Sequence, residues 1–126
     1  MTADAAQPVA VQAWFEALRD RICATFEAIE DDYAGHAHQD VAPGRFERRV
    51  WDRPGGGGGT MALMRGRVFE KVGVNVSAVH GTLAPAAQAA MAARGVPGMA
   101  EDPRFWASGI SLVAHMRNPL APAVHM

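Results

Sequence analysis

Two histidines near the end of this 126-residue sequence are the residues most suited to carry out chemistry together. His115 and His125 stand ten positions apart and bracket residues 118–122, an extended segment with two prolines. An imidazole binds metal ions and, because it titrates near neutral pH, can act as a general acid. Two histidines do not complete a zinc site, and a single histidine at a strand end is more often a structural group. The spacing leaves both interpretations open.

Other reactive side chains give weaker signals. His36 and His38 have the alternate spacing of a chelating pair, but their small neighbours favour an exposed loop, and we assign them no function. Ser111 has no base at local spacing, so the sequence does not support a serine nucleophile. The single cysteine, Cys23, cannot form an internal disulfide and falls in an apolar helical pattern, which indicates a core residue in a reducing compartment.

Positive charge gathers in one part of the chain. Residues 45–71 carry a net charge of +4, whereas the rest carries −5 and the whole chain −1. The near-neutral total excludes recruitment of nucleic acid or an anionic membrane by a global field. Arginine forks bind carboxylates and phosphates in bidentate geometry, so the basic segment favours an anionic small molecule, with Arg53 as one candidate contact. A solvated strand face is the alternative.

Five consecutive glycines, residues 55–59, invite comparison with a phosphate-binding loop. The run lacks the Lys-Ser/Thr of a P-loop and leads into a strand, which disfavours a nucleotide site. Glycines also allow close approach to a bulky ligand or form a mobile lid, and a simple hairpin connection explains them equally well. We expect no regular element within the run.

Hydrophobic periodicity predicts the elements that must position these residues. Apolar residues recur at steps of three and four from Val9 to Ile29, which predicts an amphipathic helix that ends at the acidic residues 30–32. The stripe includes Trp14. A second, short helix is predicted from Pro85 to Arg94, because proline suits a first helical turn and Gly95 follows.

The remaining segments have strand character. Residues 46–53 form one predicted strand, and residues 60–64 and 68–80 form a hairpin in which positions 72, 74, 76 and 78 face the core. A further strand at residues 110–115 leads into His115. No closing element is expected at residues 124–126, which leaves an unpaired strand and an open sheet edge.

Together these elements predict a single α+β domain with an antiparallel sheet flanked by helices. Trp51, Phe69, Trp106 and the methionines could line a pocket for a flat ring, although core packing explains them equally well. The start of the sequence lacks the features of a signal peptide, and no stretch is apolar enough to span a membrane, so a cytoplasmic location is expected.

Three motifs in order resemble the oxygen-dependent coproporphyrinogen III oxidases of haem biosynthesis. They are WDRPGGGGGT at residues 51–60, VFEKVGVNVS at residues 68–77 and SGISLVAH at residues 108–115, the last followed by Asn118-Pro119 and His125. The resemblance runs from about Val9 to Met126. Within it, Met116 stands where many members have proline, and Ala123-Val124 replaces the common Thr-x before the final histidine. Family members are considerably longer, so we expect residues 1–126 to be the N-terminal part of one oxidase domain, truncated after Met126.

The resemblance implies a reaction, a fold and roles for particular residues. It implies oxidative decarboxylation of two propionates of coproporphyrinogen III to vinyl groups by dioxygen, which gives protoporphyrinogen IX. It implies that Ser111 contacts substrate, that His115 and His125 bind a divalent metal, and that His125 donates a proton. Helices on both faces of the sheet and a homodimer are also implied, whereas no flavin, nicotinamide or haem is expected.

Part of what the family uses should lie beyond Met126: an Asn-x-Arg substrate motif, two further histidines and the dimerisation region. An inactive truncated module that binds anionic tetrapyrroles without turnover is therefore the main alternative. A histidine-metal hydrolase unrelated to porphyrins lacks its third ligand.

Overall fold

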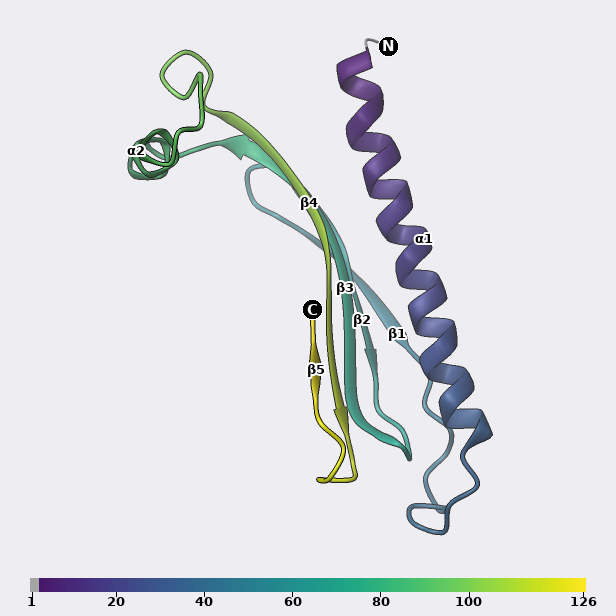
Figure 1. Ribbon diagram of the computed structural model, residues 1–126. Coiled ribbons are helices and arrows are strands. Elements are labelled where there is room, and N and C mark those ends of the chain that lie inside the picture. Colours follow the sequence, from purple (N-terminus) through teal and green to yellow (C-terminus); the bar gives the residue numbers. More distant parts are fainter. Residues whose placement is uncertain (1–2) are drawn as a thin grey trace.

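The computed structural model describes the backbone of residues 3–126 and the side chains from Gln7 onward. Its elements are α1 (Ala3–Asp32), β1 (Glu47–Asp52), β2 (Gly57–Met64), β3 (Phe69–Thr82), α2 (Pro85–Ala93), β4 (Arg104–Met116) and β5 (Val124–His125). The strands form one antiparallel sheet in the order β1-β2-β3-β4-β5. Figure 1 shows α1 along one face of this sheet and α2 beyond the far end of β3 and β4. The α+β prediction is confirmed.

The core lies between α1 and the middle of the sheet. Cys23 is buried at 3% exposure, as predicted, and Phe26 meets Phe69 edge-to-face with ring centroids 4.9 Å apart. The sheet contributes the buried side chains of Ala62, Met64, Val72, Val74, Leu112 and Ala114. Trp14 is 57% exposed and so stands outside the core, because the N-terminal half of α1 diverges from the sheet (Figure 1).

Helix α1 begins earlier than the periodicity predicts, and it ends within the acidic residues 30–32, as predicted. It begins at Ala3 and continues through the acidic residues to Asp32. The Arg67 side chain stabilises this C-terminal end, because its guanidinium donates to the free backbone carbonyls of Glu30 (2.7 and 2.9 Å) and Asp31 (3.3 Å). A cation at this end also offsets the helix dipole.

The carboxylate of Glu30 ties the end of α1 to the β2–β3 turn. It is fully buried and accepts four backbone hydrogen bonds, from Gly44 (3.2 Å), Arg67 (2.8 Å), Val68 (2.9 Å) and Phe69 (2.9 Å). Burial alone would raise the pKa of Glu30, but the four N–H donors outweigh it and hold the pKa below its ordinary value. The helix and the hairpin are therefore fixed to each other by one ionised side chain.

The prediction that the five glycines hold no regular element is wrong. Gly57, Gly58 and Gly59 belong to β2 and pair with β3, and Gly58 and Gly59 also pair with β1. A Cβ at Gly57, which has φ +80°, would overlap the Ala78 carbonyl, and a Cβ at Gly58 would overlap the carbonyl of Trp51. Glycine lets three backbones approach where side chains would force them apart. The turn itself is confined to residues 53–57, where the Arg53 amide donates to the Gly57 carbonyl (2.8 Å).

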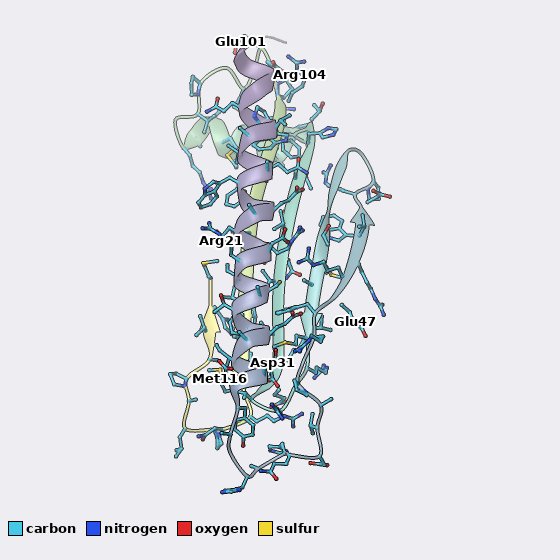
Figure 2. All side chains as sticks on the ribbon, turned by 90° about the vertical axis from the view of Figure 1, so that its right-hand side faces the viewer. Arg21, Asp31, Glu47, Glu101, Arg104 and Met116 are labelled. Carbon is cyan, nitrogen blue, oxygen red and sulfur yellow. The ribbon has the colours of Figure 1, made fainter. Side chains whose placement is uncertain are left out.

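The two long strands carry the predicted alternation further than expected. In β3, Val72, Val74 and Val76 are buried under α1, while the intervening side chains face the other way. Strand β4 spans 13 residues rather than six and pairs with β3 along nearly all of its length. Figure 2 shows Met116 at the end of the molecule where α1 finishes near Asp31, and Arg104 at the opposite end with Glu101.

The expectation that nothing closes the chain at residues 124–126 is also wrong. Val124 pairs with Ala114 and His125 with Val113, and the Met126 and Leu112 backbones exchange hydrogen bonds of 2.9 and 3.0 Å. Sequence periodicity cannot detect a strand this short. Within the described residues, the outer edge of β4 before Leu112 stays unpaired, so the expected open edge is real but begins further along the chain.

The described part of the chain places a helix layer on only one face of the sheet. We call the face away from α1 the open face. No helix of the described residues is long and apolar enough to cross a membrane.

Candidate functional site

Three of the predicted site residues lie on the open face, and two of them, the histidines, come together there. Leu112 and Ala114 of β4 point to the core, so Ser111 and His115 point to the open face by strand alternation. His125 pairs with Val113, which places its side chain on this face as well. The register sets Ser111 opposite Asn75 and His115 opposite Lys71 of β3. The side chains therefore share the open face, with Ser111 about 13 Å along β4 from His115.

The two histidines meet despite the ten residues between them. Their Nε2 atoms lie 3.3 Å apart, with ring centroids at 5.4 Å and ring planes at 51°. The connection between β4 and β5 reverses the chain at Asn118, whose side-chain oxygen accepts from the Leu120 amide (2.9 Å). Both imidazoles are exposed to solvent. The proline-containing segment that the sequence marks as extended is thus the turn that brings the pair together.

Arg117 fixes the start of this connection. Its backbone amide donates to the Val68 carbonyl (2.9 Å), and its Nε donates to the Gly66 carbonyl (2.7 Å). Gly66 and Val68 belong to the turn that the Glu30 carboxylate holds. The segment that carries His125 is therefore anchored, through Arg117, to the same point as the end of α1.

A pair of imidazole nitrogens at this separation has two chemical uses. One neutral ring can accept a hydrogen bond from the other, which suits transfer of a proton. Alternatively, two nitrogens bound to one metal at about 2.0–2.1 Å with a tetrahedral angle lie about 3.3–3.4 Å apart, which fits the 3.3 Å observed. The described residues contain no group of three or more His, Cys, Asp or Glu side chains suited to a metal, so the pair would supply two ligands of a set.

A groove of about 480 Å³ on the open face begins at His115. Apolar side chains of Met61, Leu63 and Val113 line it, together with the polar side chains of Lys71, Asn75 and His115. The Asn75 amide lies 3.5 Å from the Ser111 hydroxyl. Residue-by-residue reasoning did not single out Lys71 or Asn75, although both stand in the VFEKVGVNVS motif and their alternation with the core valines marks them as open-face residues.

Arg53 lies apart from these residues. It follows β1, and its Nη1 donates to the His80 carbonyl (3.0 Å) while its guanidinium lies 5.5 Å from the centroid of the Phe105 ring. These contacts hold it near the β1–β2 turn, at the other end of the sheet from His115. Of the proposed ring-stacking residues, Phe69 is buried in the core.

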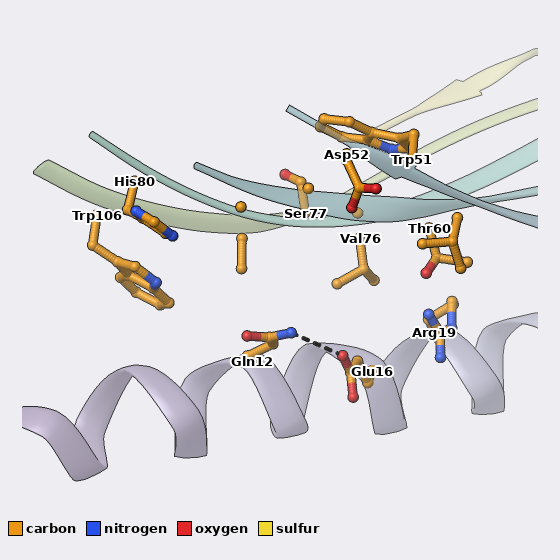
Figure 3. A pocket seen from close by; sticks show the side chains of 15 residues that line it. Gln12, Glu16, Arg19, Trp51, Asp52, Thr60, Val76, Ser77, His80 and Trp106 are labelled. Atoms are coloured by element: carbon orange, nitrogen blue, oxygen red, sulfur yellow. Dashed lines mark hydrogen bonds between the residues drawn. The ribbon is translucent and has the colours of Figure 1, made fainter. Parts of the chain in front are cut away.

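A second cavity, of about 370 Å³, lies on the helix-covered face between α1 and the sheet. His80 and Trp106 extend from the sheet toward Gln12 and Glu16 of α1, and the Gln12 amide donates to Glu16 (3.1 Å) (Figure 3). This cavity is separated by the sheet from Ser111, His115 and His125. His36 and His38 lie in the exposed loop after α1, away from both cavities.

Comparison with known proteins places these features in a family. Residues 10–126 match the family model described as coproporphyrinogen III oxidase. The chain is 50% identical over 113 residues to the oxygen-dependent coproporphyrinogen-III oxidase of Rickettsia bellii (strain RML369-C), 90% of this chain and 38% of that protein. It is 49% identical over 113 residues to the protein of the same name from Rickettsia peacockii (strain Rustic), with the same coverage. The chain thus spans 38% of the length of these curated relatives. With a match over residues 10–126 and about half of the aligned residues identical, the chain belongs to the coproporphyrinogen III oxidase family.

Proposed function

We propose that this chain forms the part of an oxygen-dependent coproporphyrinogen III oxidase that holds the substrate and donates a proton. The observation that supports this most directly is the meeting of His115 and His125 at the edge of a groove that combines apolar side chains with the polar groups of Lys71 and Asn75. An apolar macrocycle that carries carboxylates needs both an apolar surface and convergent polar groups. A homodimer and a cytoplasmic location, both implied by the family resemblance, belong to the same proposal.

The reaction requires a site that holds a propionate while it loses carbon dioxide and two electrons. Each propionate loses carbon dioxide from its carboxylate and a hydride equivalent from the carbon next to the ring, which leaves a vinyl group. Dioxygen accepts the two electrons and, with one proton from the hydride equivalent and one from the protein, becomes hydrogen peroxide. In this scheme His125 supplies the proton, because an imidazole can act as a general acid and the Nε2 of His125 lies beside that of His115.

The other residues orient and hold the substrate. Ser111 and Asn75 present a hydroxyl and an amide beside the groove and can donate to a carboxylate. Arg53 remains a predicted contact for a propionate, through the guanidinium donors that do not bind His80. A divalent metal, if part of the enzyme, would be held by His115 and His125 with ligands from elsewhere and would stabilise negative charge as a Lewis acid.

Binding of coproporphyrin III, the stable oxidised form of the substrate, tests the proposal on the 126-residue chain. We expect saturable binding, seen as a shift of the porphyrin absorption band, and no binding of its uncharged tetramethyl ester. Ser111→Ala should weaken binding, while His36→Ala, a change in the exposed loop, should leave it unchanged. Absence of binding to the wild-type chain would contradict the proposal.

Turnover separates an enzyme from a module that only binds. Aerobic incubation with coproporphyrinogen III labelled in its propionate carboxyl groups would release labelled carbon dioxide if the chain is active by itself. His125→Ala should abolish this release and leave coproporphyrin binding largely intact, because the proposal gives His125 a proton to donate rather than a carboxylate to hold. Binding without release of carbon dioxide would instead support the inactive module. The structural argument for this module is that the described residues supply only two histidine ligands for a metal.

A further inference from the structure

The open face carries a cation that neither the fold nor the histidine pair requires. Lys71 is the only lysine of the chain, and all the other permanently charged basic residues are arginines. It follows the irregular β3–β4 pairing between Phe69 and Lys71, is exposed, and lies opposite His115 in the register. Among the described residues no carboxylate lies within 4.0 Å of its ammonium group. Its charge is available to an external anion.

The surroundings of Lys71 define the kind of anion. Lys71 borders the groove of about 480 Å³, whose apolar side is formed by Met61 and Leu63, 47% and 41% exposed. Large apolar side chains exposed beside an unpaired cation suit a ligand that has both an apolar body and an acidic group. The nearest open-face charges on β1, Glu47 and Arg49, have opposite signs and lie across Leu63 and Met61. They leave Lys71 as the uncompensated charge of the groove.

We propose that the Lys71 ammonium group anchors a carboxylate of a flat, apolar ligand whose ring lies on Met61 and Leu63. This inference rests on the proposed function for the identity of that ligand, and it adds a subsite: one propionate is held at Lys71, opposite His115, while a second can reach Ser111, four residues away along β4. A lysine suits this place because a compact ammonium on a flexible chain can follow a carboxylate as the ring shifts, whereas a guanidinium fork fixes it in one plane.

The unique lysine allows a selective test. Acylation of the folded chain by an amine-reactive ester, followed by mass spectrometry of the peptide that contains Lys71, reports how accessible this one side chain is. We expect saturating coproporphyrin III to slow acylation of Lys71 several-fold, and 3-phenylpropionate, a single propionate on an apolar ring, to slow it as well. The tetramethyl ester of coproporphyrin, which lacks carboxylates, should give no protection.

Variants measure the contribution of the charge to binding. Lys71→Gln should weaken coproporphyrin III binding roughly threefold to tenfold, as expected for one partly exposed charged contact, while Lys71→Arg should retain most of the affinity. Arg65→Gln is the matched control, because it removes the same charge from the adjoining turn outside the groove. Urea midpoints of the variants show whether each is folded.

The outcomes distinguish this inference from the function on which it rests. Coproporphyrin binding that leaves Lys71 unprotected and is unchanged in Lys71→Gln overturns the subsite and keeps the proposed function. Protection by 3-phenylpropionate without any coproporphyrin binding keeps the subsite and overturns the proposed ligand. Absence of coproporphyrin binding together with absence of protection by 3-phenylpropionate overturns both.

Discussion

Replacing Glu30 with glutamine should destabilise the fold more than replacement of any other polar side chain of α1. The Glu30 carboxylate is inaccessible to solvent, and its two oxygens accept two backbone hydrogen bonds each. Glutamine keeps the shape but offers one acceptor oxygen, and its NH₂ group faces two N–H donors. Two backbone amides therefore lose their acceptor inside the protein.

The size of the effect follows from these bonds. A hydrogen bond to a charged group contributes about 1.5–3 kcal/mol, so the loss of two amounts to about 3–6 kcal/mol. The amide avoids part of the desolvation cost of a buried charge, which reduces the expected loss to about 3–4 kcal/mol. Because the total stability of a domain is about 5–15 kcal/mol, this loss would be a substantial fraction.

Urea unfolding at neutral pH, followed by tryptophan fluorescence and circular dichroism, measures the change. Asp31→Asn is the control on the neighbouring residue: its side chain is 49% exposed and pairs with Arg45 at 2.7 Å, an exposed ion pair that contributes less than about 1 kcal/mol. If Glu30→Gln lowered the free energy of unfolding by no more than this control does, the carboxylate would not be the link between α1 and the β2–β3 turn.

The same carboxylate predicts a pH dependence. The pKa of Glu30 in the folded chain lies below its ordinary value of 4.5, so the ionised form is favoured by folding. Its contribution is complete above the ordinary pKa and is lost as the pH falls through the lower, folded value. The stability difference between wild type and Glu30→Gln should therefore narrow in acid below about pH 4. A difference that stayed constant across this range would refute the ionised carboxylate.

Two further predictions concern other parts of the fold. A Cβ at Gly66 would overlap the Glu30 carboxylate, so Gly66→Ala should lower the free energy of unfolding in urea by about 1–3 kcal/mol. In the control Gly109→Ala, no atom lies within 4 Å of the new Cβ, so this change should be neutral or stabilise by up to about 1 kcal/mol. Equal losses in the two variants would contradict the crowding at Gly66. Cys23 is buried, and burial raises the pKa of its thiol, so the rate at which Ellman's reagent modifies Cys23 should be limited by local opening of the chain. The reaction should be faster in Glu30→Gln. Rapid reaction in the native wild type would contradict the packing of α1 on the sheet.

Local patterns in the sequence predict most of the sheet. The valines at positions 72, 74 and 76 alternate with smaller or polar residues, and that alternation alone identifies which side of β3 faces the core. The same rule places Ser111 and His115 on the opposite side of the neighbouring strand. Elements with a strong period, such as β3 and the middle of α1, were predicted because one face of each is buried.

The features that were missed depend on partners far away in the chain. Nothing near Glu30 indicates that its carboxylate will bind amides 14 to 39 residues later. Likewise, the glycines of β2 predict an interruption of regular structure unless it is known that β1 and β3 approach them on both sides. Strand β5 has only two residues, too few to give a periodic pattern. The meeting of His115 and His125 needs the turn at Asn118 as well as the strand pairing, so spacing alone could suggest the pair but not its geometry.

Because the final strand is short, it leaves part of the edge of β4 unpaired, and this affects self-association of the chain in solution. Leu112 exchanges backbone hydrogen bonds with Met126, so by alternation the amides and carbonyls of Trp106, Ser108 and Ile110 are directed outward along the same border of β4. From Phe105 to Ile110 this border carries neither a charge nor a proline, the two devices that discourage strands of separate molecules from joining. We expect self-association at high concentration to begin at this border, and solubility to respond to a proline or lysine placed there more than to the overall charge.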